Sequence, residues 1–420
     1  MSGDVDIAIV GAGAAGLAAA RRVRDFGLSF AMLEAKGRIG GRAFTDTATF
    51  GTPWDRGAHW LHSAAVNPLT RVAEALGQPY LKRESFRNRN VHLGSHWASE
   101  AERNDYNEVM DAAFDAVDEL GERGLDVPVA QALDKSNRWY RLIEHVHEAI
   151  SAFPPEKISA LDLHRYYDSG ENWPLINGYG ALVAAYGASV PVSLETPVTE
   201  IDLTGQGVRL TTPKGTVKAR AVIVTVSTNV LASGRIRFLP GLPAALRHAL
   251  DGVPTGGANK IAFQFSRNVF GMPDTSYASF MDERDPSRHA LSFQIRPFGK
   301  ELAIAYLGGR FAEEMEKAGE AASIEMARSA LTDMFGSSIL DTLVKVATTA
   351  WCGDPHTLGA YASALPGHAA ERAVLSEPVD GKLYLTGEAV HPTWFSTVQG
   401  AYLSGIEAAN RVAASLNHCP

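Results

Sequence analysis

The sequence predicts an α/β fold in which a Rossmann-like domain is interrupted by an inserted α+β domain of helices and a mixed sheet. Three observations support this prediction. An apolar run at residues 5–10 is followed at once by a glycine-rich turn and an alanine-rich stretch. Similar apolar runs recur far along the chain, at 220–227 and 382–387. Between these runs the sequence shows first a helical and then a strand pattern, which indicates an insertion.

Length and composition limit the class of protein. The chain has 420 residues, of which 45% are hydrophobic and 20% charged, as in a globular protein of two or three domains. The net charge of −8 argues against nucleic acid as a partner. Two cysteines, Cys352 and Cys419, are too few for a disulfide framework or a cysteine metal site, and no metal site is predicted.

The chain shows no recognisable export or membrane signal. It starts MSGDVDIAIVGAG and enters its first apolar strand without the basic and apolar leader of a signal peptide. No apolar run reaches the ~20 residues that a membrane-spanning helix needs, so no membrane anchor is expected. We therefore expect a soluble cytoplasmic protein.

The N-terminal segment has the pattern of a β–α–β unit. Residues 5–10 are almost all apolar, as in a strand that is buried on both faces. The alanine-rich helix should run to about Phe26, where Gly27 can end it. The second strand is predicted at 28–34, with the sequence LSFAMLE.

The inserted domain is predicted from two further patterns. Residues 100–150 have apolar positions near helical spacing, among many acids and arginines. Residues 258–310 contain four strand-like segments, NKIAFQF, YASFMD, ALSFQI and ELAIAYLG. The expected division gives the Rossmann-like domain residues 1–75, 190–255 and 376–420, and the substrate domain residues 76–189 and 256–375.

The glycine-rich turn predicts a dinucleotide site. Gly11, Gly13 and Gly16 fit G-x-G-x-x-G. The glycines permit a tight turn, close approach of the backbone to a pyrophosphate, and close packing of the helix on the strand. The helix N-terminus offers N–H groups and a partial positive charge to the phosphates. Glu34, which ends the second strand, stands where an acid accepts hydrogen bonds from a ribose.

The residues after Glu34 favour FAD over NAD. Gly40 and Gly41 are followed by Arg42. These residues can place a second set of N–H groups and a guanidinium against the pyrophosphate, an extension that NAD dehydrogenases usually lack. A surface loop with a solvated arginine is the alternative.

Five segments together resemble the flavin amine oxidase family. The first is E-A-x-x-R-x-G-G-R, from Glu34 to Arg42. The others follow in the family's order: GAHWLHSAAVNPL at 57–69, ANKIAFQF at 258–265, WCGDPHTLGAYASALPG at 351–367 and LYLTGEAVHPTWFSTVQGAYLSGIEAANRV at 383–412. The resemblance implies an FAD enzyme that acts on a carbon–nitrogen bond. The flavin-binding residues it implies are Gly11, Gly13, Ala15, Gly16, Glu34, Ala35, Gly40, Gly41, Arg42, Gly57, Ala58, His59, Trp60, Val198, Trp351, Gly387, Glu388, Thr397 and Val398.

The C-terminal segment is expected to face the flavin ring system. Glu388 directly follows a predicted strand, where its carboxylate could bond the ribityl hydroxyls. Ser396 and Gln399 have capping-box spacing, so a helix is predicted to start at Thr397–Val398. If this helix points at the flavin, its N–H groups and dipole would stabilise the anionic reduced form. An ordinary capped helix is the alternative.

Lys260 is a predicted catalytic residue. Strand alternation places Ile261 and Phe263 on a core face, and Lys260, Ala262 and Gln264 on a face that would line a cavity. In the family that the chain resembles, this lysine holds a water bridged to flavin N5. A solvated lysine on a strand is the alternative.

Tyr361, a second predicted catalytic residue, resembles the family tyrosine that forms a wall of the aromatic passage for the amine. Covalent monoamine oxidases have a cysteine just before this tyrosine, whereas Ala360 here predicts non-covalently bound FAD. Their second cage tyrosine aligns with Thr397, so Trp394 and Phe395 are expected to supply aromatic surface to the substrate. This departure points toward polyamine-type enzymes.

His62 completes the predicted catalytic set. Its W-L-H context resembles spermine and acetylpolyamine oxidases, in which this histidine faces the substrate. A histidine that only holds its loop in place is the alternative. Asp168 and Glu171 are candidate anchors for the distal ammonium of an amine, although acids at such positions are more often solvated.

The resemblance implies hydride transfer from the carbon beside a neutral amine to flavin N5, hydrolysis of the imine, and reoxidation by O₂ to give H₂O₂. We expect a polyamine or another secondary amine as substrate. Monoamine oxidation is an alternative, as is a flavin carbon–carbon desaturase or porphyrinogen oxidase, although these generally lack the Lys260–Tyr361 combination. A non-enzymatic carrier of related fold is disfavoured, because the second glycine pair and the flavin-facing helix are both present.

Overall fold

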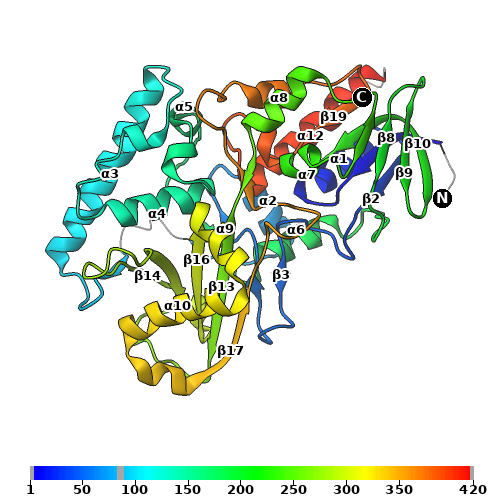
Figure 1. Ribbon diagram of the computed structural model, residues 1–420. Helices are drawn as coiled ribbons and strands as arrows, with labels where there is room; N and C mark the ends of the chain where they lie inside the picture. The colour runs from blue at the N-terminus through cyan, green and yellow to red at the C-terminus, as the bar shows by residue number, and fades with distance from the viewer. Residues whose placement is uncertain (1–3, 83–88, 417–420) are drawn as a thin grey trace.

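Two large β-sheets organise the molecule, and each takes strands from distant parts of the sequence (Figure 1). The computed structural model describes residues 4–82 and 89–416. Helices cover the sheets, and a separate group of helices lies beside the second sheet. The predicted α/β class, with a Rossmann-like part and an α+β part, is confirmed.

The first sheet has seven strands in the order β11-β8-β9-β10-β1-β2, with β19 also paired to β10. β1 lies between β10 and β2 and is parallel to both, and β19 is parallel to β10. The three apolar runs of the sequence therefore meet in one sheet. Its strands are β1 (Asp4–Val10), β2 (Phe30–Leu33), β8 (Glu200–Asp202), β9 (Val208–Thr212), β10 (Gly215–Val224), β11 (Arg237–Leu239) and β19 (Leu383–Leu385).

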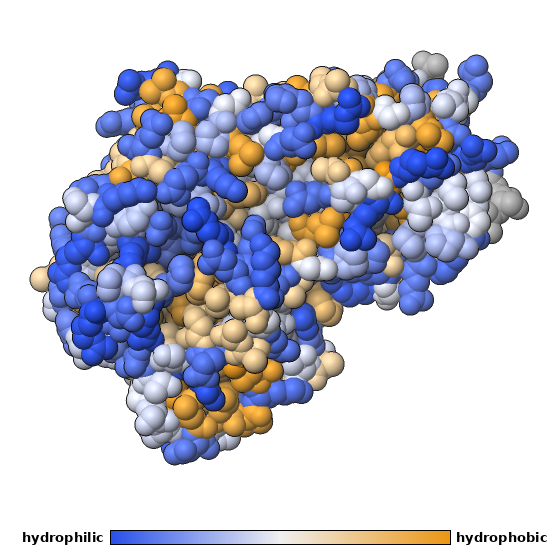
Figure 2. All heavy atoms as spheres, viewed as in Figure 1, coloured by the Kyte–Doolittle hydropathy of each residue, from blue (hydrophilic) through white to orange (hydrophobic). Residues whose placement is uncertain are grey.

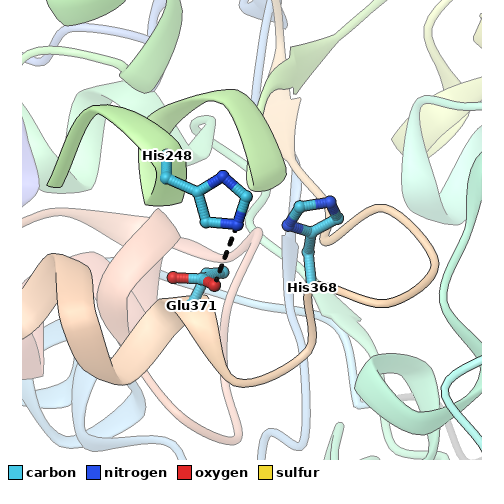
Figure 3. A group of neighbouring side chains, drawn as sticks. All are labelled: His248, His368 and Glu371. Carbon is cyan, nitrogen blue, oxygen red and sulfur yellow. Dashed lines mark ion pairs between the residues drawn. The ribbon is translucent and has the colours of Figure 1, made fainter. Parts of the chain in front are cut away.

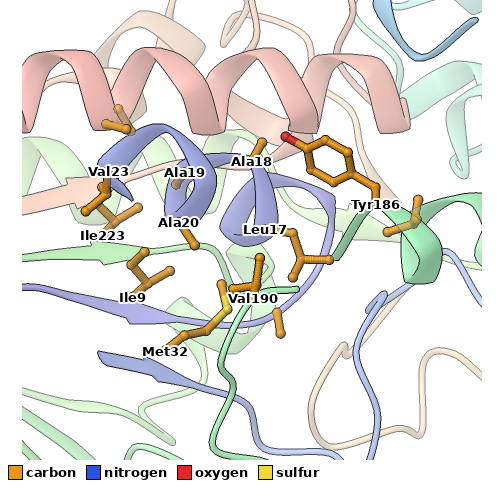
Figure 4. Packing of buried hydrophobic residues seen from close by; sticks show 14 of the residues in the cluster. Ile9, Leu17, Ala18, Ala19, Ala20, Val23, Met32, Tyr186, Val190 and Ile223 are labelled. Carbon is orange, nitrogen blue, oxygen red and sulfur yellow. The ribbon is translucent and has the colours of Figure 1, made fainter. Parts of the chain in front are cut away.

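Helices cover both faces of this sheet. α1 (Ala14–Asp25) packs between the sheet, which supplies Ile9 and Ile223, and α12 (Val398–Ser415) (Figure 4). The alanines of α1 allow this close packing, because their side chains end at Cβ. The other face is covered by α7 (Thr228–Ala232), α8 (Ala244–Gly252) and α11 (Glu371–Ser376).

The second sheet has six strands in the order β17-β13-β16-β15-β14-β6. All neighbours are antiparallel except β6 and β14. The predicted alternation on β13 is correct for its core face, where Ile261 and Phe263 pack with α9 (Gly309–Ala318) and α10 (Glu320–Phe335). The strands are β6 (Asn90–His92), β13 (Ala258–Phe265), β14 (Ser276–Phe280), β15 (Leu291–Ile295), β16 (Leu302–Gly308) and β17 (Leu343–Thr348).

The helices predicted within 100–150 form an arm beside the second sheet (Figure 1). α3 (Glu100–Glu122) begins with a capping box between Ser99 and Glu102. α4 (Tyr140–Ser151) and α5 (Ala160–His164) complete the arm, around a core that contains the fully buried Trp139.

Short strand pairs tie distant segments together. The pairs are β3 (Thr45–Asp46) with β4 (Trp54–Asp55), β5 (Trp60–Leu61) with β7 (Trp173–Pro174), and β12 (Thr255–Gly256) with β18 (Tyr361–Ala362). Two further helices are α2 (Pro68–Ala75) and α6 (Tyr179–Gly187).

The start of α12 corrects one detail of the sequence analysis. The helix begins at Val398, as predicted, but its cap is Thr397, whose Oγ1 accepts a hydrogen bond from Gly400 N at 3.0 Å. The predicted capping box of Ser396 and Gln399 is wrong. Ser396 has a φ of +62°, and its Oγ donates instead to Ala362 O at 2.6 Å.

Hydrophilic residues cover most of the face drawn in Figure 2. An apolar group gathers where β17 and α10 lie, and Val344 on β17 is 61% exposed. Within residues 4–82 and 89–416, no helix combines the length and the apolar character that crossing a bilayer requires.

Candidate active site

A cavity of about 830 Å³ is lined by residues of both sheets and of the helical arm. Its volume lies in the range of small-molecule and cofactor sites. The lining includes most of the predicted site residues: Gly11, Gly13, Ala15, Glu34, Ala35, Gly40, Gly41, Arg42, Gly57, Ala58, His59, Trp60, His62, Asp168, Val198, Lys260, Trp351, Tyr361, Gly387, Glu388, Phe395, Thr397 and Val398.

Two glycine turns lie side by side in the wall of this cavity. Gly40 N donates to Ala12 O at 2.8 Å, and Gly13 and Gly40 form a β-bridge. α1 begins at Ala14 without a side-chain cap, so no capping side chain occupies the N–H groups of its first turn. Closely approaching backbone at an uncapped helix N-terminus fits the pyrophosphate of a dinucleotide.

Gly16 acts by packing and does not line the cavity. A Cβ on this residue would lie 2.0 Å from Gly11 O, so α1 could not pack on β1 in this way with a larger residue there. This contact is the helix–strand packing that the glycine motif predicts.

Glu34 is buried at the end of β2, at the wall of the cavity. Its carboxylate accepts hydrogen bonds from Ala12 N at 2.7 Å and from Lys36 N at 2.8 Å. These bonds fix an acceptor beside the glycine turns, where a ribose hydroxyl can donate to it.

Arg42 and Glu388 form an ion pair that the sequence did not reveal. Arg42 Nη1 lies 2.8 Å from Glu388 Oε1 and also donates to Ala360 O at 2.7 Å. Glu388 Oε2 accepts from Ala362 N at 3.2 Å and from Ser396 N at 3.1 Å. The pair therefore holds the segment around Tyr361 and the approach to α12 at the cavity wall.

Lys260 lies at the cavity on β13 and is only 8% exposed. Its Nζ donates to Asp55 O at 2.9 Å and to Gly57 O at 2.6 Å. Burial lowers the pKa of Lys260 to about 8, because a charged ammonium loses hydration there. Its Nζ lies 5.3 Å from the ring centre of Tyr306, which is its cross-strand neighbour on β16.

The prediction that the whole of this β13 face lines a cavity is wrong beyond Lys260. Ala262 packs in a small apolar cluster with Phe50 and Trp54. Gln264 Nε2 donates to Phe50 O at 3.0 Å. The segment around Phe50 covers this end of the face, a long-range contact that strand alternation cannot predict.

Asp55 is a buried acid near Lys260 that the sequence analysis did not select. Its carboxylate contacts His59 Nδ1 at 2.8 Å and accepts from Tyr179 N at 3.0 Å. Burial opposes its charge, but the His59 hydrogen bond and the charges of His59 and Lys260 outweigh burial, so the pKa of Asp55 lies below its usual value. Its position just before the 57–69 motif is the signal that could have revealed it.

His62 is placed by the pairing of β5 with β7. Trp60 pairs with Pro174 and Leu61 with Trp173, which brings His62 to Asn172. His62 Nδ1 and Asn172 Oδ1 are hydrogen-bonded. Burial lowers the pKa of His62, against the opposing effects of Asn172 and Asp168, so the imidazole is neutral at pH 7.

Aromatic rings line the cavity together with Lys260 and His62. They include Trp60, Tyr166, Tyr277, Tyr306, Tyr361 and Phe395. The Tyr361 hydroxyl is hydrogen-bonded to Ala149 O, which fixes its ring. Aromatic faces attract an amine in its cationic form and orient a neutral one by contact.

Two of the four predicted substrate residues do not line the cavity. Trp394 contacts the rings of Tyr167 and His391 instead. Glu171 is also absent from the lining, whereas its neighbour Asn172 lines the cavity and is hydrogen-bonded to His62. Asp168 and Phe395 do line the cavity, the first as an exposed acid and the second as a buried aromatic wall.

No thiol stands at the position of covalent attachment, which Ala360 occupies. Cys352 is half-buried and lies outside the cavity lining. Burial raises the pKa of its thiol to about 12, so it is not a reactive thiolate. These residues fit a flavin that is bound without a covalent bond.

Comparison with known proteins gives a consistent family. The family described as flavin containing amine oxidoreductase matches residues 14–413. Polyamine oxidase 4 of Oryza sativa subsp. japonica is 29% identical to this chain, and the match covers 96% of this chain and 88% of the length of that oxidase. Lysine-specific histone demethylase 2 of Homo sapiens is 27% identical over 97% of this chain, which spans 53% of the demethylase.

A solved structure of putrescine oxidase with putrescine bound has a TM-score of 0.80 to this chain. The match covers 98% of this chain and 99% of the other at 21% identity, a likeness that shows the shared fold. Since the family match extends over residues 14–413, this chain belongs to the flavin-containing amine oxidoreductases and is an FAD-dependent enzyme.

Proposed function

We propose that the enzyme oxidises a polyamine or another secondary amine, with O₂ as the electron acceptor and H₂O₂ as a product. The observation that carries this proposal is the meeting of His62 and Asp168 with Lys260 and Tyr361 at one cavity. A polyamine oxidase among the relatives and a putrescine oxidase of the same fold support it.

His62 can receive the amine as a hydrogen-bond acceptor. Asn172 Nδ2 donates to Gly170 O at 3.3 Å, so Asn172 Oδ1 is left to accept from His62 Nδ1. This arrangement selects the tautomer in which His62 Nε2 carries a lone pair. A substrate ammonium that donates to Nε2 is held in position and can lose its proton there before oxidation.

Bound FAD supplies the hydride acceptor and the route of electrons to O₂. The paired glycine turns, Glu34 and the start of α12 are the elements that would hold it. The rings of Tyr361 and Tyr306 exclude water and orient the amine. Lys260 Nζ holds a proton or a water at the same wall.

Charge at the cavity indicates where the distal end of a polyamine binds. Asp168 and Asp118, both exposed and both at the cavity, attract a distal ammonium.

A peroxide-coupled comparison of substrates tests the proposal. We expect kcat/KM for spermine, spermidine and their acetylated forms to exceed that for benzylamine and phenethylamine. If the aromatic monoamines are better by about tenfold or more, a difference of ~1.4 kcal/mol in transition-state binding, the polyamine assignment is wrong.

A further inference from the structure

Three metal-ligand side chains gather outside the cavity, at two helices that cover the first sheet (Figure 3). His248 belongs to α8 and Glu371 is the first residue of α11, while His368 lies in the turn before α11. One ligand atom of each lies within 4.8 Å of the other two. The active site described above uses none of them.

Their geometry is close to that of a metal site. His248 Nε2 lies 3.6 Å from Glu371 Oε1. A tetrahedral zinc with bonds of about 2.1 Å separates neighbouring ligand atoms by roughly 3.4 Å, so this pair needs almost no adjustment. The His248 side chain is 63% exposed, and it can therefore turn toward a metal without repacking its surroundings.

His368 adds an independent observation. Its Nδ1 is buried and has no hydrogen-bond partner among the described residues. Figure 3 shows a ring nitrogen of His368 facing His248 and Glu371. A Cβ on Gly252 would lie 2.4 Å from this Nδ1, so the end of α8 packs directly against the ring. A buried polar atom without a partner costs free energy, and a bound metal would remove that cost.

We infer that His248, His368 and Glu371 bind a divalent transition-metal ion of the Zn²⁺ class, with water completing the coordination. Two imidazole nitrogens and one carboxylate oxygen suit Zn²⁺, whereas Mg²⁺ and Ca²⁺ prefer oxygen ligands alone. The ion joins α8 to α11 and adds a cross-link between two segments that are distant in the sequence. That distance is why ligand spacing along the sequence predicted no metal site.

The linked helix supports the cavity wall. Arg372, the next residue on α11, pairs with Asp162 at 2.7 Å and donates to Ala362 O at 3.3 Å, beside Tyr361. The ion therefore stabilises this part of the fold without contacting substrate. We expect it to raise thermal stability and to take no part in the chemistry.

Equilibrium dialysis of the untagged, flavin-loaded enzyme against micromolar Zn²⁺, followed by elemental analysis, tests the inference. We expect one bound Zn²⁺ per chain in the wild type, and affinity at least about tenfold weaker in His248→Ala and in Glu371→Gln. Zn²⁺ should raise the Tm of the wild type and leave that of His248→Ala unchanged, and Mg²⁺ should not replace it.

His96→Ala is the matched control. His96 Nε2 and Glu102 Oε2 form a similar pair at 3.7 Å, but no second histidine joins them in a metal-ligand group within the described ranges. This variant should bind Zn²⁺ as the wild type does. Flavin absorbance and amine turnover in the absence of Zn²⁺ show that each variant is folded. The site is refuted if the wild type takes up no Zn²⁺, or if His248→Ala and Glu371→Gln bind it with unchanged affinity.

Discussion

Burial sets the chemistry of Lys260 at the cavity wall. Lys260 gives up most of its hydration, and its two hydrogen bonds to the carbonyls of Asp55 and Gly57 replace only part of it. Its pKa falls to about 8 for this reason, so its proton is exchangeable near neutral pH. An exposed lysine on the same strand would stay charged and contribute nothing of this kind.

Lys260→Met tests this role. We expect the variant to retain FAD, because Lys260 bonds to backbone of the protein itself, and to lose about 10²–10³-fold in turnover, or ~2–4 kcal/mol, because methionine fills the space but holds no proton or water. Rapid-mixing measurements of flavin reduction and reoxidation provide the check. Wild-type rates in both half-reactions would remove Lys260 from the mechanism.

The pH dependence of the reoxidation rate is a second test of the role of Lys260. Lys260 is protonated below its pKa of about 8 and neutral above it. In the proposed reaction, O₂ takes up two electrons and two protons to form H₂O₂, and a protonated Lys260 favours this uptake, so the reoxidation rate of the wild type should fall as pH rises through about 8. Lys260→Met should be slow throughout and show no step near that pH. A step of the same size in both proteins would assign the titration to another group.

Exposure limits what Asp168 can contribute. The residue is exposed at the cavity, so its attraction for an ammonium is screened by water and amounts to at most ~1 kcal/mol. Asp168→Asn should therefore lower kcat/KM for spermidine by only about two- to fivefold at low salt, and less at high salt. Glu171→Gln is the matched control, since Glu171 does not line the cavity. Equal losses in the two variants would mean that net charge, and not position, matters.

Most of the residues that the family motifs select lie at the cavity, whereas the residues that long-range strand pairing brings there were not selected. Lys260 and His62 were selected from motifs, and both lie at the cavity. The residues that contact Lys260 and His62 were not selected, because the pairing of distant strands creates those contacts. Tyr306 faces Lys260 only because β13 pairs with β16, and Asn172 faces His62 only because β5 pairs with β7.

At the level of elements, small residues determine how closely the helices approach the first sheet. Gly16 allows α1 to approach β1, and Gly405 of α12 would place a Cβ 2.1 Å from Ala15 O of α1. In both cases the added Cβ would meet a backbone oxygen, so neither clash could be relieved by turning a side chain. The position of the glycine turn at the cavity therefore depends on these two contacts.

Gly16→Ala should displace α1 and so weaken FAD binding, although the substituted residue does not itself line the cavity. Overpacking against a fixed backbone atom costs about 1–3 kcal/mol, and part of that cost should appear as lower flavin occupancy. Gly241→Ala is the control, because a Cβ there meets nothing within 4 Å. Thermal unfolding and the flavin absorbance of both purified variants are the measurements. Full flavin occupancy and an unchanged Tm in Gly16→Ala would contradict the packing argument.

The elements themselves were predictable because their patterns are local. The strands at 5–10 and 258–310 and the start of α12 agree with the sequence analysis. The cap of α12 was not predictable from spacing alone. The φ of +62° at Ser396 turns that residue away from the helix, and the bond from Ser396 Oγ to Ala362 O shows that a tertiary contact directs it.

At the level of the whole molecule, the cavity is where distant parts of the chain meet. Its wall extends in sequence from Val10 to Ala401 and combines the carboxyl ends of β1 and β2 with β13 of the second sheet. The sequence predicted that the three apolar runs belong together, and β1, β10 and β19 do pair in one sheet. The ion pair of Arg42 with Glu388 could not be predicted, because nothing local relates two residues at opposite ends of the chain.

A ligand that fills this cavity would contact many segments and should stabilise the entire fold, and removal of FAD is the corresponding experiment. Acid precipitation should release FAD into the supernatant, since Ala360 offers no thiol to the flavin. For the native enzyme, FAD at about 100 times its dissociation constant adds ~2.7 kcal/mol to the free energy of unfolding. Spread over a chain of 420 residues, this amounts to roughly 3 °C in Tm, and more at higher FAD concentration. Scanning calorimetry of apoprotein and of apoprotein with added FAD measures the difference. Flavin that stays with the acid pellet would overturn the non-covalent assignment, and a Tm independent of FAD would show that the cofactor does not join the parts of the chain that line the cavity.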